Sequence, residues 1–177
     1  MMTPEQRFVC MSHNRAKDTG PELLLRHALW RKGFRFLVND KRLPGSPDIV
    51  LPKYRTVIFV HGCFWHGHKD CKYYTVPKTN RDFWIKKVTR NQERDQDVWR
   101  QLEAKGWFVI IVWECQLKKT KLSETIDGVS NEIRRNGDSF QWAQVNRRAA
   151  RSSYLLERKH RKEREAVLLV ELQKHFQ

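Results

Sequence analysis

Residues 57–71 constrain the fold of this chain more than any other segment. Four β-branched or aromatic residues at 57–60 predict a short buried strand. The strand leads into a stretch with three histidines and two cysteines: His61, Cys63, His66, His68 and Cys71. Neutral imidazole and thiolate are the ligands that tetrahedral zinc prefers, and imidazole also transfers protons near neutral pH. The segment therefore predicts a metal-tied loop that carries proton-transfer chemistry.

Cys115 is the expected fourth ligand of this loop. It follows the apolar run 107–113, which predicts a second strand, buried on both faces, and adjacent strands would bring its thiolate beside the loop. Together with Cys63, Cys71 and either His66 or His68 it would close a Cys3His site, which is structural by type because no position is left for a substrate. The alternative is a set of buried cysteines, which the clustering of three of the four cysteines disfavours.

The charge of the chain points to a polyanionic partner. The sequence has 177 residues, with 35 Lys+Arg against 20 Asp+Glu and a formal net charge of +15, which predicts attraction to nucleic acid first. No apolar run is long enough for a membrane span and the N-terminus lacks a signal-peptide core, so a cytoplasmic protein with reduced thiols is expected. We expect a zinc-containing domain over residues 1–137 and a basic helical extension over 138–177, with Gly137 at the boundary.

The remaining periodicities predict an α/β fold. A helix is expected from Thr19 to Gly33, with leucines 23, 24, 25 and 29 inward. Strands are expected at 34–38, 48–51 and 56–61, as an antiparallel meander whose first strand buries one face. A long helix follows from Thr79 or Asn80 to about Lys105, where Gly106 stops it. Ser123 would cap a last helix, with its apolar residues 126, 129 and 133 inward.

Asp48 is the candidate catalytic acid. It begins a strand next to the strand that ends in His61, so carboxylate and imidazole should meet at one edge of the sheet. A carboxylate there can hold Mg²⁺, which would stabilise charge that develops on a phosphodiester, while a histidine deprotonates the attacking water. Glu22 and Asp95 could orient the imidazoles. The aromatic residues Phe64, Trp65 and Trp84 would either pack in the core or act as a wedge that opens a base step.

Several motifs of this sequence resemble the very short patch repair (Vsr) endonucleases, over about residues 11–135. The resemblance lies in Met11-Ser12, Lys17-Asp18-Thr19, Pro21-Glu22, residues 43–48 (LPGSPD), residues 57–66 (VIFVHGCFWH), residues 91–95 (NQERD) and residues 112–115 (VWEC). It implies a restriction-endonuclease-like central mixed sheet flanked by helices. It also implies a Mg²⁺-dependent nick 5′ to the thymine of a T:G mismatch, as arises when 5-methylcytosine deaminates. The implied setting is the bacterial nucleoid, beside a cytosine methyltransferase and possible mismatch-repair partners.

The resemblance assigns roles residue by residue. It implies that Asp48 and the carbonyl of Val60 bind Mg²⁺, that His66 is the general base and that His61 assists at the phosphate, with Glu22 and Asp95 as supporting acids. The implied zinc ligands are Cys63, His68, Cys71 and Cys115. The implied DNA contacts are Phe64, Trp65, Trp84, Lys87, Asn91 and, from an N-terminal arm, Met11.

The chain departs from related patterns at the site. The wider nuclease superfamily carries an acid-x-Lys pair where Phe59 and His61 stand here, as they do in the resembled family, which favours a histidine-based mechanism. Val60 replaces a threonine found in some relatives, a change that a backbone ligand would survive. Residues 139–177 match nothing in the resembled family. Two alternatives are a restriction-type endonuclease on matched DNA and a non-catalytic zinc-stapled DNA-binding module.

Overall fold

The computed structural model describes residues 17–141, 143 and 144. The chain divides into two compact units between Gly137 and Asp138, and the described residues of the second unit are helical. The expected N-terminal arm with Met11 and most of the expected helical extension lie outside the described residues. Among the residues described, no helix has the length and the apolar character that a membrane span requires.

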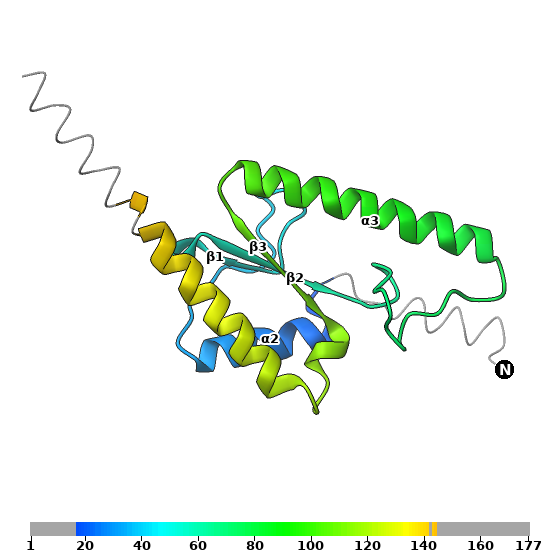
Figure 1. Ribbon diagram of the computed structural model, residues 1–177, viewed down its shortest axis with the longest axis horizontal. Coiled ribbons are helices and arrows are strands. Elements are labelled where there is room, and N and C mark those ends of the chain that lie inside the picture. Colours follow the sequence, from blue (N-terminus) through cyan, green and yellow to red (C-terminus); the bar gives the residue numbers. More distant parts are fainter. Residues whose placement is uncertain (1–16, 142, 145–177) are drawn as a thin grey trace, which may run out of the picture. The chain divides into compact units, whose positions relative to one another are not determined.

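A three-stranded mixed sheet forms the centre of the first unit (Figure 1). Its strands are β1 (Ile49–Leu51), β2 (Thr56–His61) and β3 (Phe108–Trp113), in the order β1-β2-β3. The short 3-10 helix η1 (Pro52–Tyr54) turns β1 into its antiparallel neighbour β2. β2 and β3 run parallel, so a long crossover that contains helix α3 (Arg81–Ala104) connects them.

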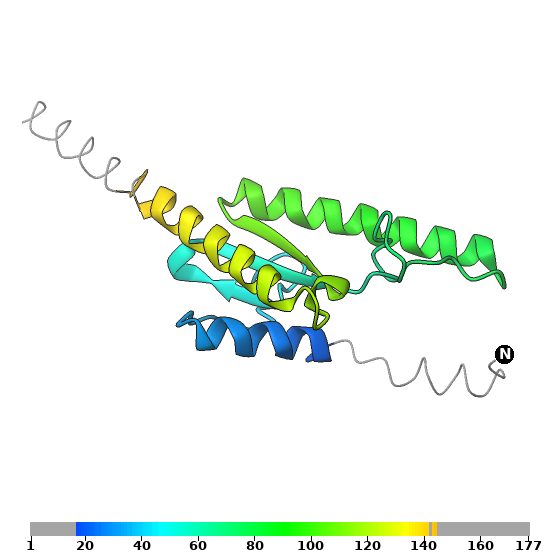
Figure 2. The same cartoon turned by 60° about the horizontal axis from the view of Figure 1, so that its bottom comes forward.

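Helices cover the two faces of the sheet. α3 lies on one face, and α2 (Gly20–Arg31) and the helical residues 122–137 lie on the other, as Figures 1 and 2 show. Alternate strand residues enter separate cores, because side chains in a strand point to opposite faces. One core joins α2 and helix 122–137 to strand residues such as Ile58, whereas the other joins α3 to residues such as Val57 and Phe59.

Two glycines end the helices where the sequence predicts. Gly33 has a φ of 88°, and the amides of Gly33 and Phe34 donate to the carbonyls of Trp30 and Leu29. Gly106 has a φ of 75° and ends α3 with the same pair of bonds. Both turns need a left-handed residue, which glycine adopts without a steric cost.

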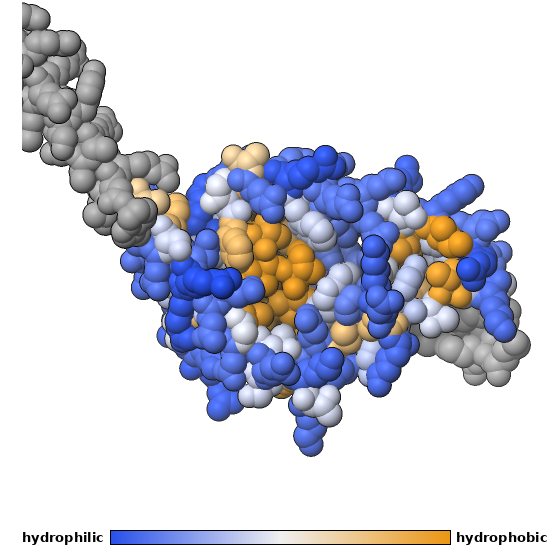
Figure 3. Space-filling model, in the orientation of Figure 1, coloured by the Kyte–Doolittle hydropathy of each residue, from blue (hydrophilic) through white to orange (hydrophobic). Residues whose placement is uncertain are grey.

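The predictions for the sheet were wrong in two places. Residues 34–38 do not form a strand; they contribute one antiparallel bridge, Leu37 to Val50, and Val38 is 47% exposed. β3 is not buried on both faces, because the core on the α3 side covers Val109 and Ile111 only in part. Ile110 and Val112 are buried, but Phe108 is exposed, and Figure 3 shows an apolar area on the surface between α3 and helix 122–137.

The helical predictions need smaller corrections. Leu23 and Leu24 of α2 are exposed rather than inward. The last helix begins at residue 122, one position before Ser123. It also continues through Gly137, where a Cβ atom would lie 2.5 Å from Cδ1 of Tyr54. Glycine is therefore needed at 137 for close packing, and it does not end the helix.

Candidate active site

A cleft of about 1020 Å³ brings the predicted catalytic residues together. It lies where the start of α2, the turn before β1, the end of β2 and the middle of α3 meet. All five predicted catalytic side chains line it: Glu22, Asp48, His61, His66 and Asp95. Asp48 and His61 meet because β1 and β2 are antiparallel neighbours, so the start of β1 lies beside the end of β2. α2 brings Glu22 from one face of the sheet, and α3 brings Asp95 from the other.

Asp48 is a half-buried carboxylate at the entrance to β1. The amide of Val60 on β2 donates to its Oδ2 at 2.7 Å. Burial raises the pKa of Asp48 to about 6, the negative charge of Glu22 adds to this, and the Val60 amide opposes it. A bound cation would relieve the cost of ionising this carboxylate, so the position suits a metal ligand.

Two stacked imidazoles lie in the same cleft. The rings of His61 and His66 are 3.7 Å apart between centroids and 15° from coplanar. Burial and the nearby His66 lower the pKa of His61 to about 3, so this ring is neutral at physiological pH. Its Nδ1 is buried and has no hydrogen-bond partner among the residues described here. A buried polar atom without a partner is uncommon in folded proteins and is typical of functional sites.

His66 is oriented by a carboxylate. Its Nδ1 lies 2.5 Å from Oδ2 of Asp95, which is buried on α3. Burial works to raise the pKa of Asp95, but the hydrogen bond with His66 and the electrostatic attraction of the two imidazoles outweigh it, so this pKa is lowered. A carboxylate on Nδ1 selects the tautomer whose Nε2 can accept a proton. The arrangement suits a general base.

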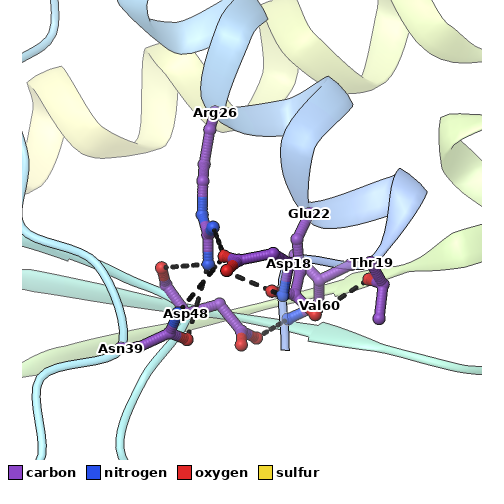
Figure 4. Close-up of polar contacts among 7 residues, drawn as sticks. All are labelled: Asp18, Thr19, Glu22, Arg26, Asn39, Asp48 and Val60. Carbon is purple, nitrogen blue, oxygen red and sulfur yellow. Dashed lines mark hydrogen bonds and ion pairs between the residues drawn. The ribbon is translucent and has the colours of Figure 1, made fainter. Parts of the chain in front are cut away.

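Glu22 does not orient the histidines, in contrast to the sequence-based prediction. Its carboxylate accepts hydrogen bonds from the hydroxyl of Thr19, the amide of Asp18 and the guanidinium of Arg26 (Figure 4). The first two bonds tie its carboxylate to the residues just before α2. Glu22 therefore contributes negative charge beside Asp48, whereas the predicted orienting role belongs to Asp95 alone.

A second cluster gathers three cysteines and a histidine. The ligand atoms of Cys63, His68, Cys71 and Cys115 all lie within 4.8 Å of one another. Nδ1 of His68 is 3.5 Å from the Sγ atoms of both Cys63 and Cys115. The parallel register pairs His61 with Trp113, so Cys63 and Cys115 each follow the end of adjacent strands. This donor set could hold a metal ion, and His66 is not part of it.

The predicted DNA-contacting aromatics form one cluster outside the cores. Phe64, Trp65 and Trp84 make edge-to-face contacts, with ring centroids 5.2 to 6.0 Å apart. All three are only partly buried. The ammonium of Lys87 lies 5.9 Å from the Trp65 ring, and the amide of Asn91 donates to the Trp65 carbonyl at 2.9 Å. α3 therefore supports the part of the loop after β2 that carries Phe64 and Trp65, which we call the aromatic tip.

Some residues at the site were not predicted from the sequence. Arg26 is buried and bonds to the main chain of Asp48, and Gln92 donates to the carbonyls of His66 and Gly67 at 3.2 Å each. Arg26 follows Glu22 by four positions, which places both on one face of α2. That spacing was the signal available in the sequence.

This fold and this site define the class of the protein: an α/β enzyme with a carboxylate–histidine centre and a separate Cys/His cluster suited to metal. Residues 1–73 match the family model described as DNA mismatch endonuclease Vsr. The chain is 47% identical over 135 residues to the type II nicking enzyme V.NmeAIP of Neisseria meningitidis, covering 76% of this chain and 96% of that enzyme. The chain belongs to the Vsr endonuclease family.

Two further relatives agree with this assignment. The DNA mismatch endonuclease Vsr of Escherichia coli is 46% identical over 109 residues, which cover 61% of this chain and 69% of that enzyme. The type II nicking enzyme V.XorIIP of Xanthomonas oryzae is 47% identical over 116 residues, which cover 66% of this chain and 85% of that enzyme. The predicted family, and with it the prediction of an endonuclease, is confirmed.

Proposed function

We propose that this protein is a Mg²⁺-dependent DNA endonuclease that nicks one strand 5′ to the thymine of a T:G mismatch. The mismatch would arise from deaminated 5-methylcytosine. A cytosine methyltransferase and mismatch-repair proteins would act beside the enzyme. The fold would be of the restriction-endonuclease type. The observation that carries the proposal is the single cleft that holds Asp48 together with the His66–Asp95 pair. Family membership supports the choice of DNA as substrate.

Asp48 and the main-chain carbonyl of Val60 are the proposed Mg²⁺ ligands. The fit rests on the half-buried carboxylate whose pKa is raised to about 6 by burial, since such an anion favours a cation. When bound, Mg²⁺ would stabilise negative charge on the phosphodiester. The amide of Val60 holds the carboxylate of Asp48 in place by donating a hydrogen bond to it.

His66 is the proposed general base. With Nδ1 bound to Asp95, its Nε2 accepts the proton of the attacking water. His61 stacks on His66 and stays neutral, because burial holds its pKa near 3. A neutral His61 can donate one hydrogen bond to the phosphate without competing for the proton.

The remaining predicted residues would support DNA binding. Zn²⁺ bound by Cys63, His68, Cys71 and Cys115 would fix the loop that carries the aromatic tip, since a Cys3His set is of the structural type. Phe64, Trp65 and Trp84 would enter the duplex beside the mismatch, with Lys87 and Asn91 facing the bases and Met11 entering from the other groove. The partial exposure of the three aromatic side chains, of which Trp65 lines the cleft, supports this proposal.

The test is a nicking assay on duplexes that differ only in the central base pair. We expect a nick in the thymine strand of T:G with Mg²⁺, and none with a matched pair. We expect Asp48→Ala or His66→Ala to abolish nicking and to leave binding, with exposed His27 and Asp97 as matched alanine controls. Equal cleavage of matched DNA would favour the restriction-type alternative. Binding without cleavage under any divalent ion would favour a non-catalytic module.

A further inference from the structure

Arg26 is a buried arginine that joins four segments of the chain beside the cleft. Only 7% of the residue is exposed. Its guanidinium forms an ion pair with Asp18 and bonds to Glu22 at 3.0 Å, to Oδ1 of Asn39 at 3.4 Å and to the carbonyl of Asp48 at 3.2 Å (Figure 4). A buried charge is costly unless it is paired, so these partners account for its presence.

The contacts of Arg26 fix Asp48 from the main-chain side. Arg26 holds the carbonyl of Asp48 from α2, while the amide of Val60 holds its carboxylate from β2 (Figure 4). Asp48 precedes β1, so the sheet ladder does not yet fix its main chain. The two bonds therefore set where its carboxylate lies in the cleft.

Only an arginine can make all of these contacts. A guanidinium presents five donors in a planar fork, which can reach a carbonyl and two carboxylates at once. Lysine carries the same charge on a single nitrogen and would have to give up part of the set. Methionine has a similar length but no donor, and it would leave Glu22 and Asp18 without their cation.

We propose that Arg26 is the positioning residue for Asp48, holding the main chain of the proposed Mg²⁺ ligand so that its carboxylate points into the cleft. The proposal rests on the proposed function of Asp48. It does not make Arg26 a catalytic residue, because Arg26 acts through Asp48.

The Val60 amide offers a direct report on the position of Asp48, independent of catalysis. We would measure its hydrogen exchange by NMR in the full-length, zinc-loaded protein. In Arg26→Met we expect exchange of Val60 to become at least tenfold faster, while Ile58, which pairs with Ile49 inside the sheet, changes less than twofold. General destabilisation would instead accelerate both amides.

Single-turnover nicking of a T:G duplex at saturating Mg²⁺ supplies the second measurement. We expect Arg26→Met to lower the rate at least tenfold with duplex affinity within twofold of wild type, and Arg26→Lys to fall between the two. The matched control is Arg42→Met, since Arg42 is exposed and pairs only with Asp40 in the structure described.

An unchanged Val60 amide in Arg26→Met would overturn the proposal. If that variant does not fold, the amide is measured in Arg26→Lys, where Val60 exchange equal to wild type would have the same consequence. Failure of the proposed function has a different signature. In that case Asp48→Ala nicks at the wild-type rate. The exchange of Val60 in Arg26→Met still shows whether Arg26 holds the main chain of Asp48.

Discussion

Replacing Asp48 with asparagine should make the protein more stable in the absence of Mg²⁺ while it abolishes nicking. The folded protein holds the pKa of Asp48 at about 6, above the ordinary value of 3.8, chiefly because of burial. A carboxyl group whose pKa is raised by folding destabilises the folded state whenever the pH is high enough to ionise it. Asparagine has nearly the same shape, can still accept the Val60 amide, and carries no charge.

The size of the gain follows from the two pKa values. A pKa difference from 3.8 to about 6 corresponds to ~3 kcal/mol at pH 7, at 1.36 kcal/mol for each pKa unit. As the pH falls below 6 the folded carboxyl becomes protonated while the unfolded one stays ionised, so the gain shrinks to roughly half at pH 5. The gain is thus present above pH 6 and is lost on acidification.

Urea unfolding of zinc-saturated protein without added Mg²⁺ measures this gain at pH 7 and pH 5. The control is Asp97→Asn, because Asp97 is exposed and pairs only with Arg100 in the described structure; we expect less than about 0.5 kcal/mol there. Added Mg²⁺ should stabilise the wild type and leave Asp48→Asn unchanged. A destabilised Asp48→Asn, or a gain that does not depend on pH, would refute the reasoning.

Three further changes test other parts of the site. Asp95→Asn should lower the nicking rate roughly 10²- to 10⁴-fold with unchanged DNA affinity, because His66 loses its orienting carboxylate; equal rates would contradict this role. Cys115→Ser should lower bound zinc per chain, and with it the metal contribution to folding, on the order of 10 kcal/mol, measured by metal analysis and denaturant unfolding. Gly67→Ala should cost roughly 2–4 kcal/mol, from a φ of +61° and a Cβ 2.5 Å from Nε2 of Gln92; calorimetry would show an unchanged melting temperature if the loop adjusts freely.

The sequence predicts the parts of this protein that local rules determine. Gly33 and Gly106 end their helices because the left-handed turn is a property of one residue. The Cys/His cluster was predictable because three ligands come from one short loop and the fourth follows a neighbouring strand. Asp48 stands at the start of one predicted strand and His61 at the end of the next, so the sequence likewise predicted that the two side chains meet at one end of the sheet.

What the sequence did not predict depends on partners that are distant in the chain. The apolar run of β3 indicates burial on both faces, but the core on the α3 side covers Val109 and Ile111 only in part. Glu22 was expected beside the imidazoles, yet its partner is Arg26, since that choice depends on how α2 lies over β1. Helical spacing alone does not tell which of two nearby groups a carboxylate will bind.

The loop after β2 is fastened at both ends of its aromatic tip, and this has a mechanical consequence. Asn91 and Gln92 of α3 hold its main chain at Trp65, His66 and Gly67, and the Cys/His cluster holds the loop at Cys63 before the tip and at His68 after it. In the proposed complex such a tip is stiff. When it presses between two base pairs, the strain goes into unstacking the DNA and not into bending the protein.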